Sequence, residues 1–91
     1  MARFELLDPE MATAGSTSGS ASGDILFEMG LRCASGRNGK IDLVSAHMYF
    51  NLADRNGAED AAYHRQEVAS QMTKSDVAKA LRAARDWLTL H

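Results

Sequence analysis

The side chains that could carry acid–base, metal or nucleophilic chemistry are three histidines and one cysteine: His47, His64, His91 and Cys33. A neutral imidazole is a general base or a metal ligand near pH 7. A helical metal site would place a second ligand one turn away, but Asn51 follows His47 and Val68 follows His64 at that spacing. We therefore expect ordinary surface or half-buried histidines, with no metal site and no cofactor site.

Cys33 is the only cysteine, so it cannot form a disulfide within the chain. A reactive thiol needs a cationic neighbour, and we expect the nearby Arg32 and Arg37 to point outward. Because Cys33 lies close to Gly30 on the predicted inner side of a helix, it is interpreted as a small buried apolar group. A lone thiol fits a reducing compartment, which predicts a cytoplasmic protein.

Two further segments resemble chemical motifs only superficially. The stretch SGRNGK at 35–40 contains glycine and lysine, but it lacks the spacing of a phosphate-binding loop and no strand precedes it. The serine-rich tract at 12–23 offers hydroxyl groups without a positioned base. The sequence thus predicts no catalytic residue and a protein that is not an enzyme.

The composition favours a small all-helical domain. Hydrophobic residues make up 45% of the 91 residues and charged residues 24%, yet aromatic residues make up only 7%, so the core must consist largely of Ala, Leu, Val and Met. Small side chains suit closely packed helices. The net charge of −2 gives no general attraction to nucleic acid or to an anionic membrane, and no apolar run approaches the length of a spanning helix.

Three regions follow each other along the chain. Residues 1–11 form a short apolar peptide, broken by Asp8-Pro9. Residues 12–23 contain only Ala, Thr, Gly and Ser and are predicted to be a flexible linker. Residues 24–91 are predicted to form the folded domain. The short peptide either covers a surface of that domain as a lid or is a docking motif for another protein.

Helix start and stop signals predict four helices in the folded domain. The first spans 24–35 and ends at Gly36; the second begins after Asp42 and ends at Asn56-Gly57. The third is expected from Ala58 to about Met72, and Thr73 is expected to cap the fourth.

The second helix has two apolar faces rather than one. One face carries Leu43, Ala46, Phe50 and Ala53, and the other carries Val44, Met48 and Leu52. A helix that is apolar on two sides must pack between neighbours. We therefore expect the first helix on one face and the third or fourth helix on the other.

A pattern of small, acidic and aromatic residues runs through the first two predicted helices and the turn after them: Met29-Gly30, Gly36, Asp42, Ala46, Tyr49-Phe50, Ala53, Gly57 and Ala61. With this pattern, residues 24–88 resemble the Sel-one-like repeat, a relative of the tetratricopeptide repeat, and their end looks like the C-terminal end of small bacterial members. A second, weaker copy repeats Asp42, Ala46 and Phe50 as Asp76, Ala80 and Ala84. The chain departs from the pattern at Cys33, Asn38-Gly39, Asp54 and Arg65-Gln66. The resemblance implies two stacked antiparallel helix pairs of a short α-solenoid that acts as a protein-binding scaffold.

In such an arrangement the first helix of each pair lines a groove. This predicts a binding site for a peptide or partner protein at Phe27, Leu31, Tyr63 and Glu67, with Glu28 and Arg32 on its rim. The alternative for Phe27 and Leu31 is that they complete the core. The predicted function is a non-catalytic adaptor or scaffold.

A DNA-binding regulator is the alternative function. Lys74, Lys79, Arg82 and Arg85 would form a basic stripe on the last helix. However, no recognition helix follows, and Glu67, Asp76 and Asp86 dilute the charge. A solvated outer face explains the stripe better.

A third possibility is a structural subunit that exists only as a homo-oligomer. In that case Trp87 and Leu88 would be buried between copies.

Overall fold

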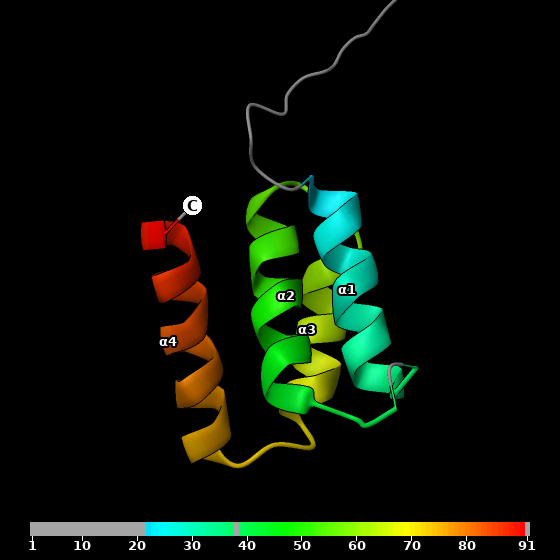
Figure 1. The fold of residues 1–91 in the computed structure, drawn as a ribbon, viewed down its shortest axis with the longest axis vertical. Coiled ribbons are helices and arrows are strands. Elements are labelled where there is room, and N and C mark those ends of the chain that lie inside the picture. The colour runs from blue at the N-terminus through cyan, green and yellow to red at the C-terminus, as the bar shows by residue number, and fades with distance from the viewer. Residues whose placement is uncertain (1–21, 38, 91) are drawn as a thin grey trace, which may run out of the picture.

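The computed structural model describes residues 22–37 and 39–90, and these residues form α-helices and no strand (Figure 1). The helices are α1 (Gly23–Ser35), α2 (Leu43–Arg55), α3 (Ala61–Ala69) and α4 (Lys74–Leu90). The predicted all-helical fold is confirmed. The predicted N-terminal peptide and most of the predicted linker lie outside the described residues. The last two linker residues belong to α1, since Ser22 caps it and Gly23 begins it.

Side-chain caps fix the start of three helices. The side chain of Ser22 accepts a hydrogen bond from the Ile25 backbone N–H, and Oδ1 of Asp42 accepts one from the Ser45 N–H at 3.0 Å. Oγ1 of Thr73 accepts a bond from the Asp76 N–H, also at 3.0 Å. These bonds satisfy donors that a helix N-terminus leaves without an intrahelical partner. The predicted caps at Asp42 and Thr73 are confirmed.

The third helix is shorter than the predicted span from Ala58 to Met72. The Ala58 N–H donates to the carbonyl of Ala53, so this residue belongs to the turn that closes α2. At the other end, the Met72 N–H donates to the carbonyl of Ala69, which is a turn rather than a continued α-helix. The alanines around 58–62 suggest helix by propensity, but the chain must first reverse direction there.

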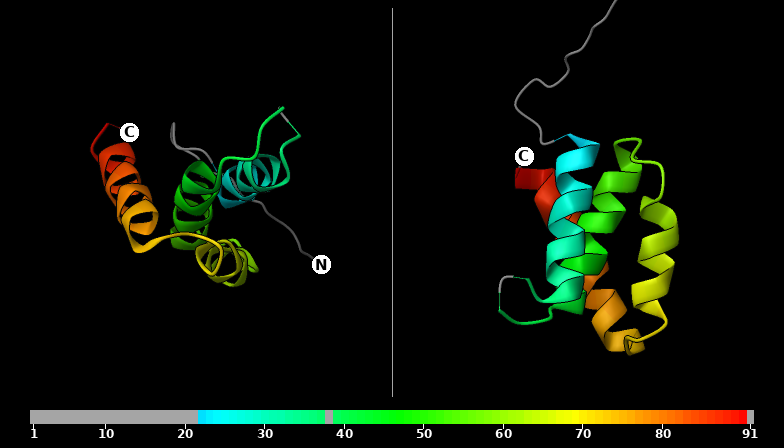
Figure 2. Two further views of the ribbon diagram at one scale, coloured as in Figure 1. Left: turned by 90° about the horizontal axis from the view of Figure 1, so that it is seen from below. Right: turned by 90° about the vertical axis from the view of Figure 1, so that its right-hand side faces the viewer.

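The second helix lies at the centre of the molecule. It packs against α1, α3 and α4, and α1 and α4 lie on opposite sides of it (Figure 2). The prediction that this helix packs between neighbours is confirmed. α1 and α2 form an antiparallel pair, whereas α4 runs in the same direction as α2 (Figure 1). Within residues 61–90, α3 and α4 scarcely touch each other; both pack on α2, so a stacked second pair is not confirmed.

Small residues allow the close approach of these helices. Ala46, Ala53, Ala61 and Ala80 are fully buried. Phe50, also fully buried, lies against the α1 backbone at Gly30, where an added Cβ would be only 2.6 Å from the Phe50 ring. The buried core residues fall into two groups. One includes Leu26, Leu52 and Ala84, and the other consists of Ala46, Phe50 and Val68.

Candidate functional site

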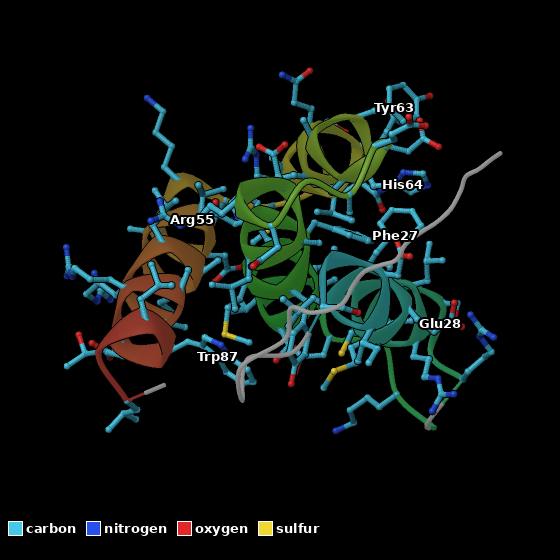
Figure 3. The ribbon with its side chains drawn as sticks, turned by 90° about the horizontal axis from the view of Figure 1, so that it is seen from above. Phe27, Glu28, Arg55, Tyr63, His64 and Trp87 are labelled. Atoms are coloured by element: carbon cyan, nitrogen blue, oxygen red, sulfur yellow. The ribbon has the colours of Figure 1, made fainter. Side chains whose placement is uncertain are left out.

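Four aromatic side chains form a row from the core to the surface between α1 and α3. The ring centroids of Phe27 and Phe50 are 5.6 Å apart, and those of Phe27 and His64 are 5.0 Å apart in an edge-to-face arrangement. Tyr63 continues the row, with its ring 5.5 Å from that of His64. Figure 3 shows Phe27, His64 and Tyr63 on one side of the molecule. We call Phe50, Phe27, His64 and Tyr63 the aromatic row.

Burial decreases along the aromatic row. Phe50 is fully buried, Phe27 and His64 are half-buried, and Tyr63 is 64% exposed. The row is therefore rigid at its inner end and open to solvent at its outer end. Edge-to-face contacts between aromatic rings are worth about 0.5–1.5 kcal/mol beyond the area they bury, so each ring helps to orient the next.

The predicted site residues divide into two groups. Phe27 and Leu31 are half-buried and pack against core residues, so much of their apolar surface is already covered by this chain. The exposed members are Glu28, Arg32, Tyr63 and Glu67. The structure brings Phe27 and Tyr63 together through His64, and it places Glu28 within 3.3 Å of Arg37 in an ion pair.

His64 was missed as a site residue by the sequence analysis. The sequence analysis assigned Phe27 and Tyr63 to one predicted groove, but the side chain that faces Phe27 is that of the next residue, His64. A signal was present, because Ala61, His64 and Val68 recur at helical spacing and the two apolar residues are buried. Assigning the buried face of this helix from that spacing would have identified His64 as a site residue.

His64 is held in place by its own helix. Its Nδ1 donates to the backbone carbonyl of Asp60 at 3.0 Å, and its backbone N–H donates to the same carbonyl at 3.1 Å. Since a carbonyl can only accept, Nδ1 carries the proton in this bond. The ring supports Phe27 and Tyr63.

His47 is the other histidine with an unusual environment. It is only 4% exposed, and among the described residues no hydrogen-bond partner is found for its Nδ1. Burial lowers the pKa of His47 below its ordinary value of 6.5, and the positive charge of Arg65 lowers it further. His47 is therefore a neutral core residue at pH 7. His91 lies outside the described residues.

Cys33 is held in its thiol form. Burial raises the pKa of this half-buried side chain, and the nearby Asp42 carboxylate raises it further. A raised pKa disfavours the thiolate that nucleophilic chemistry would require. Across residues 22–37 and 39–90, no group of three His, Cys, Asp or Glu side chains could hold a metal ion.

The basic residues of α4 are all exposed: Lys74, Lys79, Arg82 and Arg85. Nζ of Lys79 lies 3.9 Å from a carboxylate oxygen of Asp76. Of the two residues expected between copies in the oligomer alternative, Trp87 packs inside its own chain, with its ring centroid 6.0 Å from that of Tyr49 (Figure 3). Leu88 is exposed.

No protein-family profile, curated protein or solved structure matches the chain. The Sel-one-like resemblance therefore stays a prediction from the sequence. None of the helices in the described residues has the length and hydropathy needed to cross a membrane.

Proposed function

We propose that this protein is a non-catalytic adaptor or scaffold that binds a peptide or partner protein on the face formed by α1 and α3. The observation that carries the proposal is the aromatic row, which ends in the exposed ring of Tyr63. Tyrosine combines a large apolar surface with a hydroxyl group, and it is enriched among the residues that dominate binding energy at protein interfaces.

The contacts beneath Tyr63 support this role. Its ring packs on His64, which is hydrogen-bonded to the Asp60 carbonyl and packs on Phe27 and Phe50. Binding through a side chain that is already supported costs less conformational entropy than ordering a free one. The exposed charges of Glu28, Arg32 and Glu67 would then select the partner and speed its association.

The Sel-one-like resemblance supports the same face. In a short α-solenoid, α1 and α3 would be equivalent helices lining one groove, and the aromatic row joins these two helices. The single cysteine, which cannot form a disulfide within the chain, supports a cytoplasmic location.

The test is affinity capture from the cell that makes the protein, followed by titration of the captured protein. The double variant Tyr63→Ala, Glu67→Ala should have an affinity for the partner at least about tenfold lower than that of the wild type, as loss of an aromatic anchor does. The matched control is Lys79→Ala, Arg82→Ala, which changes two exposed residues of α4. Equal affinity of the Tyr63 variant and the wild type would refute the proposal.

A small DNA-binding regulator is the second candidate, favoured by the four exposed cations of α4. The same variants test it. DNA binding that falls steeply with salt, and that the Lys79→Ala, Arg82→Ala variant loses, would support this candidate. We expect no such binding, because Leu81 and Leu88 interrupt the cations and Asp76 lies beside Lys79.

A further inference from the structure

An exposed row of leucine and cationic side chains runs along α4. Leu81 is 49% exposed and Leu88 is 45% exposed. They are two helical turns apart and so lie on the same side of the helix. Arg85 lies one turn from each, and Lys74 lies two turns before Leu81; both are exposed. We call Lys74, Leu81, Arg85 and Leu88 the α4 row.

The α4 row is distinct from the side of the helix that packs on α2. That side consists of small or well-covered residues, among them the buried Ala80 and Ala84 and the half-buried Trp87. The two leucines lie at its border and continue its apolar surface into solvent. A ligand for the row would therefore need apolar side chains for Leu81 and Leu88 and a negative charge for Arg85.

A second copy of the chain is a poor ligand for the α4 row. Pairing two such rows in an antiparallel sense would place Leu81 opposite Leu88 of the other copy. Arg85 would then lie beside Arg85 of the other copy, and a parallel pairing produces the same contact. Like charges directly opposite each other are destabilising, so the charge pattern favours a different, acidic ligand.

The chain itself contains an acidic and apolar segment of this kind. Residues 1–11, MARFELLDPEM, carry the apolar side chains of Phe4, Leu6 and Leu7 together with three carboxylates and one arginine. This composition complements the α4 row in both respects. Phe27 and Leu31 offer this segment a poorer surface, because both side chains already pack against the core.

The distance between the two parts of the chain is short enough. The start of α1 and the C-terminal end of α4 lie at the same end of the molecule (Figures 1 and 2). α1 and α4 lie on opposite sides of α2, so their axes are about 20 Å apart at typical helix spacings. The ten residues 12–21 can extend to about 33 Å. Such a tether gives a local concentration near 1 mM, so even a weak contact would be well occupied.

We propose that residues 1–11 bind the α4 row of the same chain, with their apolar side chains on Leu81 and Leu88 and a carboxylate paired with Arg85. This contact covers the exposed leucines and competes with any external ligand for α4. It does not depend on the proposed function, which concerns the face of α1 and α3.

The test uses the full chain labelled with ¹⁵N and carrying a nitroxide at residue 2, through Ala2→Cys with Cys33→Ala. The amide signals of residues 81–88 should lose at least half their intensity through paramagnetic relaxation, while those of Tyr63 and Glu67 should not. Arg85→Glu should abolish the effect, and adding Glu5→Lys, Asp8→Lys and Glu10→Lys should restore it. The matched control Arg82→Glu makes the same charge change off the row and should keep the effect.

Three outcomes would overturn the proposal. The first is an absence of relaxation anywhere on α4 in the wild-type background. The second is relaxation centred on Tyr63 and His64 instead. The third is equal relaxation of α4 when spin-labelled chains without ¹⁵N are mixed with ¹⁵N chains that carry no label, because the contact would then lie between copies.

Discussion

His47 shows how one buried side chain makes the stability of the fold depend on pH. Its ring is almost completely covered, and burial together with Arg65 opposes the protonated form. The unfolded chain has no such opposition and binds a proton at about the ordinary pKa of 6.5. Whenever the unfolded state binds more protons than the folded state, lowering the pH removes stability.

We predict that the free energy of unfolding is insensitive to His47 above pH 7 and falls as the pH drops below 6.5. The loss continues until the folded state also takes up the proton, with a slope of at most about 1.4 kcal/mol per pH unit. Urea unfolding between pH 8 and pH 5 measures it. His47→Gln should remove this part of the slope, and an unchanged slope in that variant would contradict the assignment.

At Gly30 the packing of α1 on α2 requires a residue without a side chain. A Cβ at this position would lie 2.6 Å from Cε1 and 2.7 Å from Cδ1 of Phe50, which is fully buried in the core. We predict that Gly30→Ala destabilises the protein by up to about 2 kcal/mol, since an overpacking cost of about 1–3 kcal/mol is offset by about 1 kcal/mol of helix propensity gained by alanine. Thermal unfolding checks this.

Two further variants separate overpacking from other causes. Ser35→Ala, an exposed change in the same helix, should stay within about 0.5 kcal/mol of the wild type. In a Phe50→Leu background the smaller side chain leaves room, so Gly30→Ala should become neutral or stabilising. An equal loss in both backgrounds would show that Phe50 is not the obstacle.

At the scale of the elements, local signals predicted α1, α2 and α4 well and α3 poorly. Asp42 and Thr73 cap their helices by bonds that depend on neighbouring residues, and Gly36 ends α1 with a positive φ of 75°. Such signals can be recognised from sequence. The short α3 has no side-chain cap at Asp60, and Ala58 precedes it in the turn, so the alanines do not mark where the helix begins. His64 was missed for a different reason: Tyr63 was matched with Phe27, although Ala61, His64 and Val68 recur at helical spacing and His64 is the residue that faces Phe27.

We predict that Asp42→Ala lowers stability by about 1 kcal/mol, the usual cost of losing a helix N-cap. The substitution removes the acceptor for the Ser45 N–H and for Oγ of Ser45, which lies 2.7 Å from Oδ2 of Asp42. Urea unfolding at pH 7 measures the loss. Asp42→Asn is the matched control, because asparagine also caps helices and should cost only a few tenths of a kcal/mol. Equal losses in the two variants would point to charge rather than capping.

At the scale of the whole molecule, the two apolar faces of residues 43–55 predicted the central position of α2 but not the order of its neighbours. An apolar face shows that a helix packs against another part of the protein, but it does not identify which helix is the neighbour. Residues 61–90 could have formed a packed pair, as the repeat resemblance implies, yet α3 and α4 pack on α2 separately. The buried alanines of α2 and α4 explain this choice, since Ala53, Ala80 and Ala84 permit a close contact between those two helices.

This arrangement predicts that backbone amides are protected unequally from hydrogen exchange along the chain. The amides of α2, which has neighbours on three sides, should exchange with solvent only on global unfolding. Those of α4, which packs chiefly on α2, should exchange faster through local detachment. Native-state hydrogen exchange checks this, and Trp87→Ala should accelerate exchange in α4 more than in α3. Uniform protection across all the helices would contradict the prediction.

The central claim, that the face of α1 and α3 binds a protein, is tested most directly by site-specific photocrosslinking in the native cell. A photoreactive phenylalanine analogue replaces Tyr63 in one chain and the exposed Asp86 of α4 in a control chain. We predict that the chain labelled at position 63 crosslinks to one discrete protein and that the chain labelled at position 86 does not. Crosslinking of the same proteins from both positions, or none from position 63, would contradict the claim.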